Sequence, residues 1–171
     1  MRNRILILFL LLNLTAVFFA QAVEWKRYEN KGGNFSVLFP GEPKDTASDE
    51  SEGMESHTLA AMEKPAGYMV VYTRDTSEQD VDDASFQEFR NGFVKKLSNC
   101  AIDREGPRSP AIRGYLGRWY QFRCGEVNLT GNLFWGKHYS YAVMAVYPSN
   151  AGEPSNVKRF LDSFSLLDGS K

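Results

Sequence analysis

One helical stripe of large apolar side chains constrains the fold of this chain more than any other feature. The stripe recurs every three or four positions, at Phe86, Phe89, Phe93, Leu97 and Cys100. This spacing predicts a helix over residues 82–100 whose single apolar face packs against a sheet. The acidic pair Asp82 and Asp83 at its start and the basic pair Lys95 and Lys96 near its end suit the helix dipole. A shorter amphipathic pattern predicts a second helix over residues 155–164.

Segments of alternating apolar and polar residues surround these helices and predict strands. The predicted strands cover residues 24–28, 35–40, 57–64, 68–74, 112–124, 128–135, 139–147 and 165–167. Residues 42–55 are polar and acidic and predict an exposed loop, whereas 101–110 predict a broken edge strand or loop. The expected fold class is α+β: one antiparallel sheet of about six to eight strands, covered by the two helices in a single domain over residues 23–171.

The first 22 residues have the pattern of a secretory signal peptide. Arg2 and Arg4 precede an apolar run over residues 5–19, and Ala20 and Ala22 form the small-residue site that a signal peptidase cleaves before Val23. The alternative is an uncleaved membrane anchor. Export to the periplasm or secretion is therefore expected, without stable membrane insertion after cleavage.

The charge balance excludes two classes of partner. The leader holds two of the 20 basic residues and none of the 21 acidic ones, so the remaining chain has a formal charge of −3. Nucleic-acid binding requires clustered Lys and Arg, and binding to anionic lipid requires a polybasic patch. Neither pattern occurs in this sequence.

Two cysteines, Cys100 and Cys124, follow the leader. They lack the spacing of redox or zinc motifs, and an oxidising compartment allows them to pair. Cys100 lies on the sheet-facing side of the predicted helix and Cys124 on the core face of the 112–124 strand. A structural disulfide is therefore expected, and the alternative is two buried free thiols.

Catalytic motifs are missing from the sequence. It contains neither a nucleophile elbow nor a phosphate-binding glycine loop, and no cofactor is expected. Only His57 and His138 are available as imidazole bases or metal ligands, each at the start of a predicted strand. Glu55 is spaced to share a strand face with His57. A hydrolase or metal-dependent enzyme that uses either histidine with nearby acids is the enzymatic alternative.

A small recognition surface is the other candidate site. Arg118, Trp119 and Arg123 combine an aromatic ring with arginines, as protein recognition surfaces often do. Trp135 is a further candidate, with the core face of its hairpin as the alternative position. Asn34 and Asn128 begin glycosylation acceptor triplets, which matter only in a eukaryotic host.

Four segments carry a resemblance to a known family. They are GNFSVLFP at 33–40, GRWYQF at 117–122, GKHY at 136–139 followed by YAVMAVY at 141–147, and FLDSF at 160–164. The chain resembles the PsbP-like superfamily, which implies an antiparallel sheet covered by helices. It also implies a small exported accessory protein without chemistry of its own. No partner-binding or ion-binding residue of the family carries over to this chain.

These observations favour a non-enzymatic accessory or binding protein of the cell envelope. Its partner is either an unidentified envelope protein or a small ligand. Two other hypotheses remain open at this point: the histidine-dependent enzyme and a self-assembling structural protein.

Overall fold

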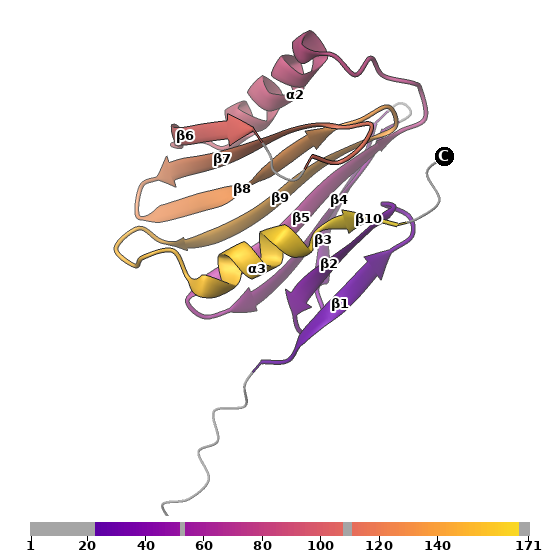
Figure 1. Ribbon diagram of the computed structural model, residues 1–171. Coiled ribbons are helices and arrows are strands. Elements are labelled where there is room, and N and C mark those ends of the chain that lie inside the picture. The colour runs from indigo at the N-terminus through magenta and orange to yellow at the C-terminus, as the bar shows by residue number, and fades with distance from the viewer. Residues whose placement is uncertain (1–22, 52–53, 108–110, 168–171) are drawn as a thin grey trace, which may run out of the picture.

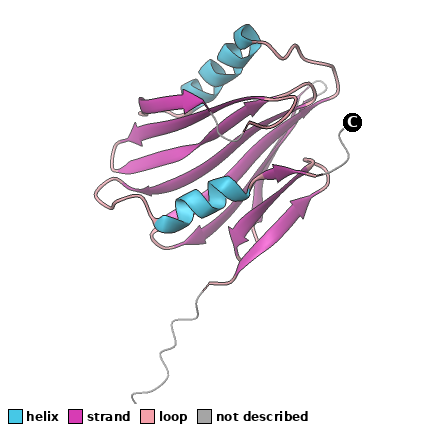
Figure 2. Ribbon diagram, in the orientation of Figure 1, coloured by secondary structure: helices cyan, strands magenta, loops and turns pink. Residues whose placement is uncertain are grey.

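A computed structural model describes residues 23–51, 54–107 and 111–167 (Figures 1 and 2). Ten strands and two helices follow one another along this part of the chain. In order they are β1 (Trp25–Asn30), β2 (Phe35–Pro40), β3 (Lys44–Ser51), β4 (Met54–Glu63), β5 (Ala66–Asp75), α2 (Asp83–Lys96), β6 (Ala101–Pro107), β7 (Leu116–Cys124), β8 (Val127–Trp135), β9 (Tyr139–Pro148), α3 (Ser155–Ser163) and β10 (Ser165–Leu166).

The strands form two antiparallel sheets. The larger has seven strands in the order β3-β4-β5-β9-β8-β7-β6, and the smaller has three in the order β1-β2-β10. Short connections of two or three residues join β4 to β5, β7 to β8 and β8 to β9, whereas β5 and β9, which pair in the centre of the sheet, are far apart in the chain. The chain runs through α2 and β6–β8 between these two central strands.

One face of the large sheet is covered by the small sheet and α3, which lie in front of it in Figure 1. Phe35, Phe39 and Phe160 are fully buried between these layers. Phe160 packs on Phe39 and on Tyr68, with ring centroids 5.4 and 5.2 Å apart. We call this apolar cluster the α3 core.

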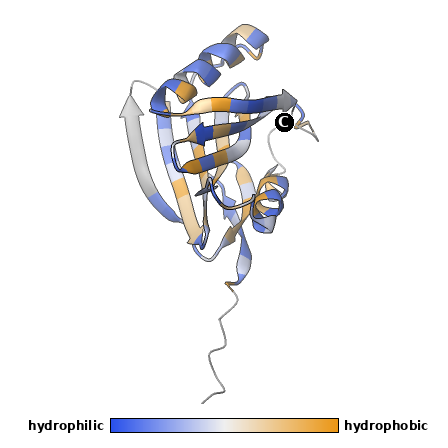
Figure 3. Ribbon diagram, turned by 90° about the vertical axis from the view of Figure 1, so that its left-hand side faces the viewer, coloured by the Kyte–Doolittle hydropathy of each residue, from blue (hydrophilic) through white to orange (hydrophobic). Residues whose placement is uncertain are grey.

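The opposite face of the large sheet packs against α2 and forms a second cluster, which we call the α2 core. Phe86, Tyr120, Phe122, Leu133 and Met144 are buried in it. The side-chain carboxylate of the N-cap residue of α2 accepts a hydrogen bond from a backbone N–H of the first turn, as an N-cap should. Figure 3 shows hydrophobic stretches along the strands and mostly hydrophilic residues along α2, the helix at the top of the view.

The predicted fold class is wrong in its balance of elements. The described part of the chain is mostly β, with ten strands in two sheets and only two short helices. One main sheet covered by two main helices was expected, yet β1, β2 and β10 form a sheet of their own that supplies most of one covering layer. The physical reason is the shortness of α3, whose nine residues bury only one small stripe.

Two local predictions also need correction. The acidic segment predicted as a loop contains β3, which pairs with β4 at the edge of the sheet. An edge strand can form backbone hydrogen bonds with its neighbour without contributing side chains to the core. Its sequence therefore needs no alternation of apolar and polar residues. The predicted 82–100 helix ends at Lys96, and the segment that follows enters β6 at the other edge.

Candidate functional site

A cleft of about 310 Å³ opens between α3 and the β6–β8 part of the large sheet. Its lining comes from strands β6, β7 and β8, from the loop before α3 and from α3 itself. The lining residues are Pro107, Trp119, Thr130, Asn132, Glu153, Lys158, Leu161 and Asp162. The volume is at the lower end of the range for small-molecule sites, so the cleft suits a small ligand.

The floor of the cleft is a polar patch on the sheet face that packs against α3, beside the apolar part of that face on β5 and β9. Trp119 on β7 pairs with Asn132 on β8, so the two side chains lie beside each other on this face. Thr130 precedes Asn132 by two positions on β8, so its side chain lies on the same face. Asn132 and Thr130 are only 2% and 1% exposed, and a buried polar pair is more informative than exposed polar residues.

A chain of hydrogen bonds leads from the floor to the rim. The hydroxyls of Thr130 and Tyr147 are 2.9 Å apart, and the Tyr147 hydroxyl donates to the Glu153 carboxylate at 3.3 Å. Burial raises the pKa of Tyr147, which keeps its hydroxyl protonated and able to donate. In contrast, the amide oxygen of Asn132 is buried without a hydrogen-bond partner.

Charged side chains form the rim. Lys158 and Asp162 pair with each other one turn apart along α3. Glu153 takes part in none of the salt bridges found among the described residues. The lining of the cleft therefore carries one uncompensated negative charge, at Glu153.

The structure divides the predicted recognition residues between two faces. Trp119 lies in the cleft, whereas Arg118 lies on the α2 side with its guanidinium 6.0 Å from the centre of the Phe86 ring. Arg123 is exposed and pairs with Asp103 at 3.0 Å. Trp135 is half-buried against the α2 core, and its indole N–H donates to the Asp80 carbonyl. Of the four, only Trp119 lines the cleft.

The other cleft residues were missed by sequence reasoning. One local signal existed, since Asn128, Thr130 and Asn132 place polar groups at alternate positions of a strand that otherwise has the composition of a core strand. Glu153 and the α3 residues had no such signal, because a loop and a helix reach this strand only through long-range packing.

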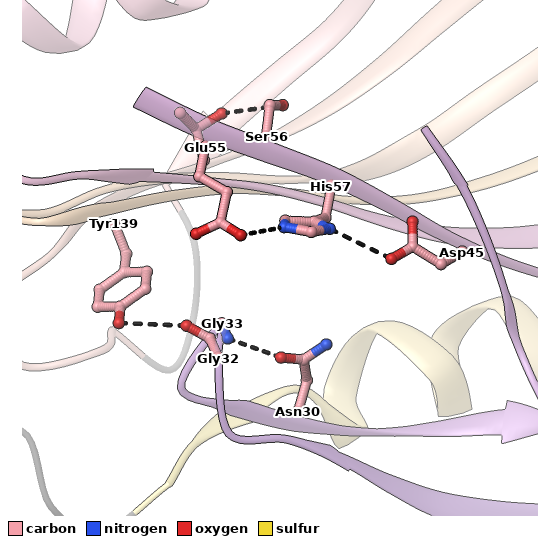
Figure 4. Close-up of polar contacts among 9 residues, drawn as sticks. Asn30, Gly32, Gly33, Asp45, Glu55, Ser56, His57 and Tyr139 are labelled. Atoms are coloured by element: carbon pink, nitrogen blue, oxygen red, sulfur yellow. Dashed lines mark hydrogen bonds and ion pairs between the residues drawn. The ribbon is translucent and has the colours of Figure 1, made fainter. Parts of the chain in front are cut away.

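His57 lies elsewhere, within β4, between the side chains of Glu55 and Asp45 (Figure 4). Its ring stacks on Tyr72 with centroids 4.9 Å apart. The prediction that it opens a strand is wrong, because β4 begins three residues earlier. Nε2 lies 2.8 Å from a Glu55 carboxylate oxygen, and Nδ1 lies 3.2 Å from a carboxylate oxygen of Asp45 on β3. The hydrogen bond to Glu55 is the main cause of a raised His57 pKa.

The turn between β1 and β2 packs near this histidine and is held by tyrosine hydroxyls. Tyr139 donates to the Gly32 carbonyl at 3.2 Å, and Tyr141 donates to the Gly33 carbonyl at 2.8 Å. A Cβ atom at Gly33 would crowd the rings of Phe35 and Tyr72, which explains a glycine at this position. The His57 surroundings therefore have the character of a packed structural junction.

His138 lies in the turn before β9, half-exposed, with Nε2 4.0 Å from the Glu78 carboxylate. The two histidines thus have different acidic neighbours. In the described part of the chain, no group of three or more histidine, cysteine, aspartate or glutamate side chains is arranged to hold a metal ion.

The predicted disulfide is confirmed. Cys100 and Cys124 are bonded, with Cα atoms 4.1 Å apart, immediately beside the paired residues Ala101 and Arg123. The bond indicates an oxidising, exported location. Of the predicted cleavage-site residues, Val23 is exposed at the start of the described chain, while Ala20 and Ala22 lie outside the described residues. Neither described helix has the length and hydropathy of a membrane-spanning segment.

Searches of protein-family models and of curated proteins found no match to this sequence. The relationship to the PsbP-like superfamily therefore stays a prediction.

Proposed function

We propose that this chain is an exported, non-enzymatic binding protein of the cell envelope, periplasmic or secreted, whose small ligand occupies the cleft beside α3. The observation that carries the proposal is the buried polar pair Thr130 and Asn132 on the floor of a cleft with a tryptophan in its wall. Sites of this kind combine apolar walls with a few placed polar groups that orient the ligand. The resemblance to the PsbP-like superfamily supports the same accessory role.

The competing hypothesis is a hydrolase or metal-dependent enzyme that uses His57 or His138. A general base or a metal ligand needs an imidazole nitrogen that reaches the substrate or the metal. Both nitrogens of His57 contact carboxylates, and its ring is stacked on Tyr72. The cleft offers the better-formed site, so binding is favoured over catalysis.

The test uses the oxidised protein and a panel of small amines, sugars, amino acids and carboxylates. The three tryptophan indole N–H signals in a ¹H–¹⁵N spectrum distinguish Trp119 from Trp25 and Trp135. A cleft ligand should shift the Trp119 signal and leave the other two in place. Asn132→Ala should weaken this binding about tenfold, the effect of losing one or two hydrogen bonds.

Asn128→Ala is the matched control, because Asn128 lies on the same strand and the same face but outside the cleft lining. Unchanged binding is expected for this variant. The proposal is overturned if no compound shifts the Trp119 signal. Stoichiometric metal, or turnover, that is lost in the double variant His57→Gln/His138→Gln would establish the enzymatic alternative instead.

A further inference from the structure

The hydrogen-bond chain at the cleft fixes which groups remain available to a ligand. The Glu153 carboxylate has no hydrogen to donate, so the single hydroxyl hydrogen of Tyr147 is used in the contact with Glu153. The contact between Thr130 and Tyr147 then takes the hydroxyl hydrogen of Thr130. Thr130 is thereby left with acceptor lone pairs and no free donor.

Asn132 adds a second acceptor on the same floor. Its Oδ1 is buried and has no partner, and leaving a buried acceptor unpaired is costly. Because Asn132 lines the cleft beside Thr130, an N–H or O–H group of a ligand would satisfy this oxygen. The floor is therefore matched to a ligand that donates hydrogen bonds.

The charge at the rim of the cleft favours a cationic ligand over a neutral one. Lys158 is neutralised by Asp162, and Glu153 has no basic partner among the residues that the structure describes. On the same sheet face, Arg123 is paired with Asp103, and Arg104 does not line the cleft. An ammonium or guanidinium group would compensate Glu153, whereas a sugar or another polyol would not.

The aromatic wall supports the same choice. The indole ring is the best of the aromatic side chains at attracting a cation to its face. Trp119 is half-buried in the wall of the cleft, next to Asn132 in the register of β7 and β8. The cleft thus combines an indole ring, two neutral acceptors and one carboxylate that accepts a hydrogen bond from the neutral Tyr147 hydroxyl.

From this combination we infer that the cleft binds a small organic cation with N–H donors, such as a diamine or a guanidinium compound. The inference rests on the proposed binding function and names the chemical class of its ligand. The ammonium or guanidinium group lies toward Glu153 and over the Trp119 ring. N–H groups of the ligand donate to the floor oxygens of Thr130 and Asn132.

Calorimetric titration with putrescine and with 1,4-butanediol tests this inference. The two compounds have the same chain length and differ in their ammonium and hydroxyl ends. Putrescine and agmatine should bind, and the diol should bind at least about tenfold more weakly because it cannot compensate the carboxylate. Added salt should weaken the binding of the cations, since the cleft is open to solvent.

Glu153→Gln removes the charge and keeps an oxygen that accepts from Tyr147. It should lower putrescine affinity about tenfold, the loss expected for one charge-assisted contact. Glu126→Gln is the control, because Glu126 is an exposed carboxylate in the β7–β8 turn and does not line the cleft. Putrescine affinity should be unchanged in that variant.

The outcomes separate the inference from the function on which it rests. Equal affinity for the diamine and the diol, or putrescine binding that is insensitive to Glu153→Gln, overturns the cationic ligand. A sugar or a carboxylate that shifts the Trp119 signal while both cations fail also overturns it, and leaves the binding function standing. If no compound of the panel reaches Trp119, the inference and the proposed function both fail.

Discussion

The imidazole of His57 is held from three sides, by two carboxylates and by the face of the Tyr72 ring. The side chain is 19% exposed, while its partners Glu55 and Asp45 are about half-exposed. The protonated ring donates from both nitrogens, and the neutral ring from only one. Folding therefore favours the charged form and raises the His57 pKa, with the hydrogen bond to Glu55 as the largest contribution.

The first prediction concerns stability and pH. Because the His57 pKa is raised above its ordinary value of 6.5, this histidine stabilises the fold fully below pH 6.5. The contribution is lost as the pH rises through the value of the folded state. Urea unfolding of wild type and His57→Gln should differ most near about pH 5.5 and least near about pH 8.5. The difference should stay below about 1 kcal/mol, because the carboxylates are partly exposed.

His138→Gln is the control, because it removes the other imidazole of the described chain, which lies at an exposed turn. A wild-type advantage over His57→Gln that grows toward alkaline pH would contradict the prediction. It would mean that the neutral ring is the form favoured by the fold.

At the scale of the element, β6 is an edge strand that is attached to the rest of the molecule mainly by β7. Its side chains are mostly exposed, so little apolar burial holds it in place. The disulfide joins Cys100, the residue just before β6, to Cys124, the last residue of β7. The sequence predicted the correct pairing for a partly wrong reason, because Cys100 follows α2 and is not part of the helix.

The second prediction is that this bond contributes substantially to stability. The cysteines are 24 residues apart, and a loop of this size corresponds to about 3 kcal/mol of stabilisation from the restricted unfolded chain. The double variant Cys100→Ser/Cys124→Ser should lose about that amount in urea unfolding. Intact-mass analysis of wild type should show the loss of two hydrogens.

Reductant provides the control, since it should destabilise wild type and leave the double variant unchanged. Two alkylatable thiols in protein recovered from an oxidising compartment would contradict the disulfide. A double variant as stable as wild type would show that β6 is held by packing alone.

At the scale of the whole molecule, the two cores share one set of strands. β8 and β9 send alternate side chains to the α3 core and to the α2 core, as Phe134 and Leu133 do on β8. Loss of either covering layer exposes one face of strands whose other face is still packed. The two cores should therefore lose their structure together.

The third prediction is a single unfolding transition that reports on both cores. Phe160 and Phe86 are buried in the α3 core and the α2 core, respectively, at 0% and 1% exposure. Either one changed to alanine should cost about 3–5 kcal/mol and shift the whole transition. Near-UV and far-UV circular dichroism should give coincident curves for wild type and for both variants. Two separated transitions, one moved by each variant, would indicate two independent units.

The sequence alone determined the features that depend on local side-chain periodicity. The spacing of Phe86, Phe89 and Phe93 placed α2, and alternation placed β2, β4, β5 and β7–β9 to within a few residues. The pattern around Cys124 also placed Tyr120 and Phe122 on the buried face of β7. A side chain's face in a helix or strand follows from its own neighbours in sequence, so these features were accessible without a structure.

Only the tertiary structure decided which strands share a sheet and which polar groups meet. β3 has no apolar alternation because it lies at an edge, and the separate β1-β2-β10 sheet joins chain segments from opposite ends of the sequence. The candidate site likewise brings Trp119, Asn132 and Glu153 together from two strands and a distant loop. These contacts depend on how whole layers pack against each other. The free energy of that packing is spread over residues far apart in the chain.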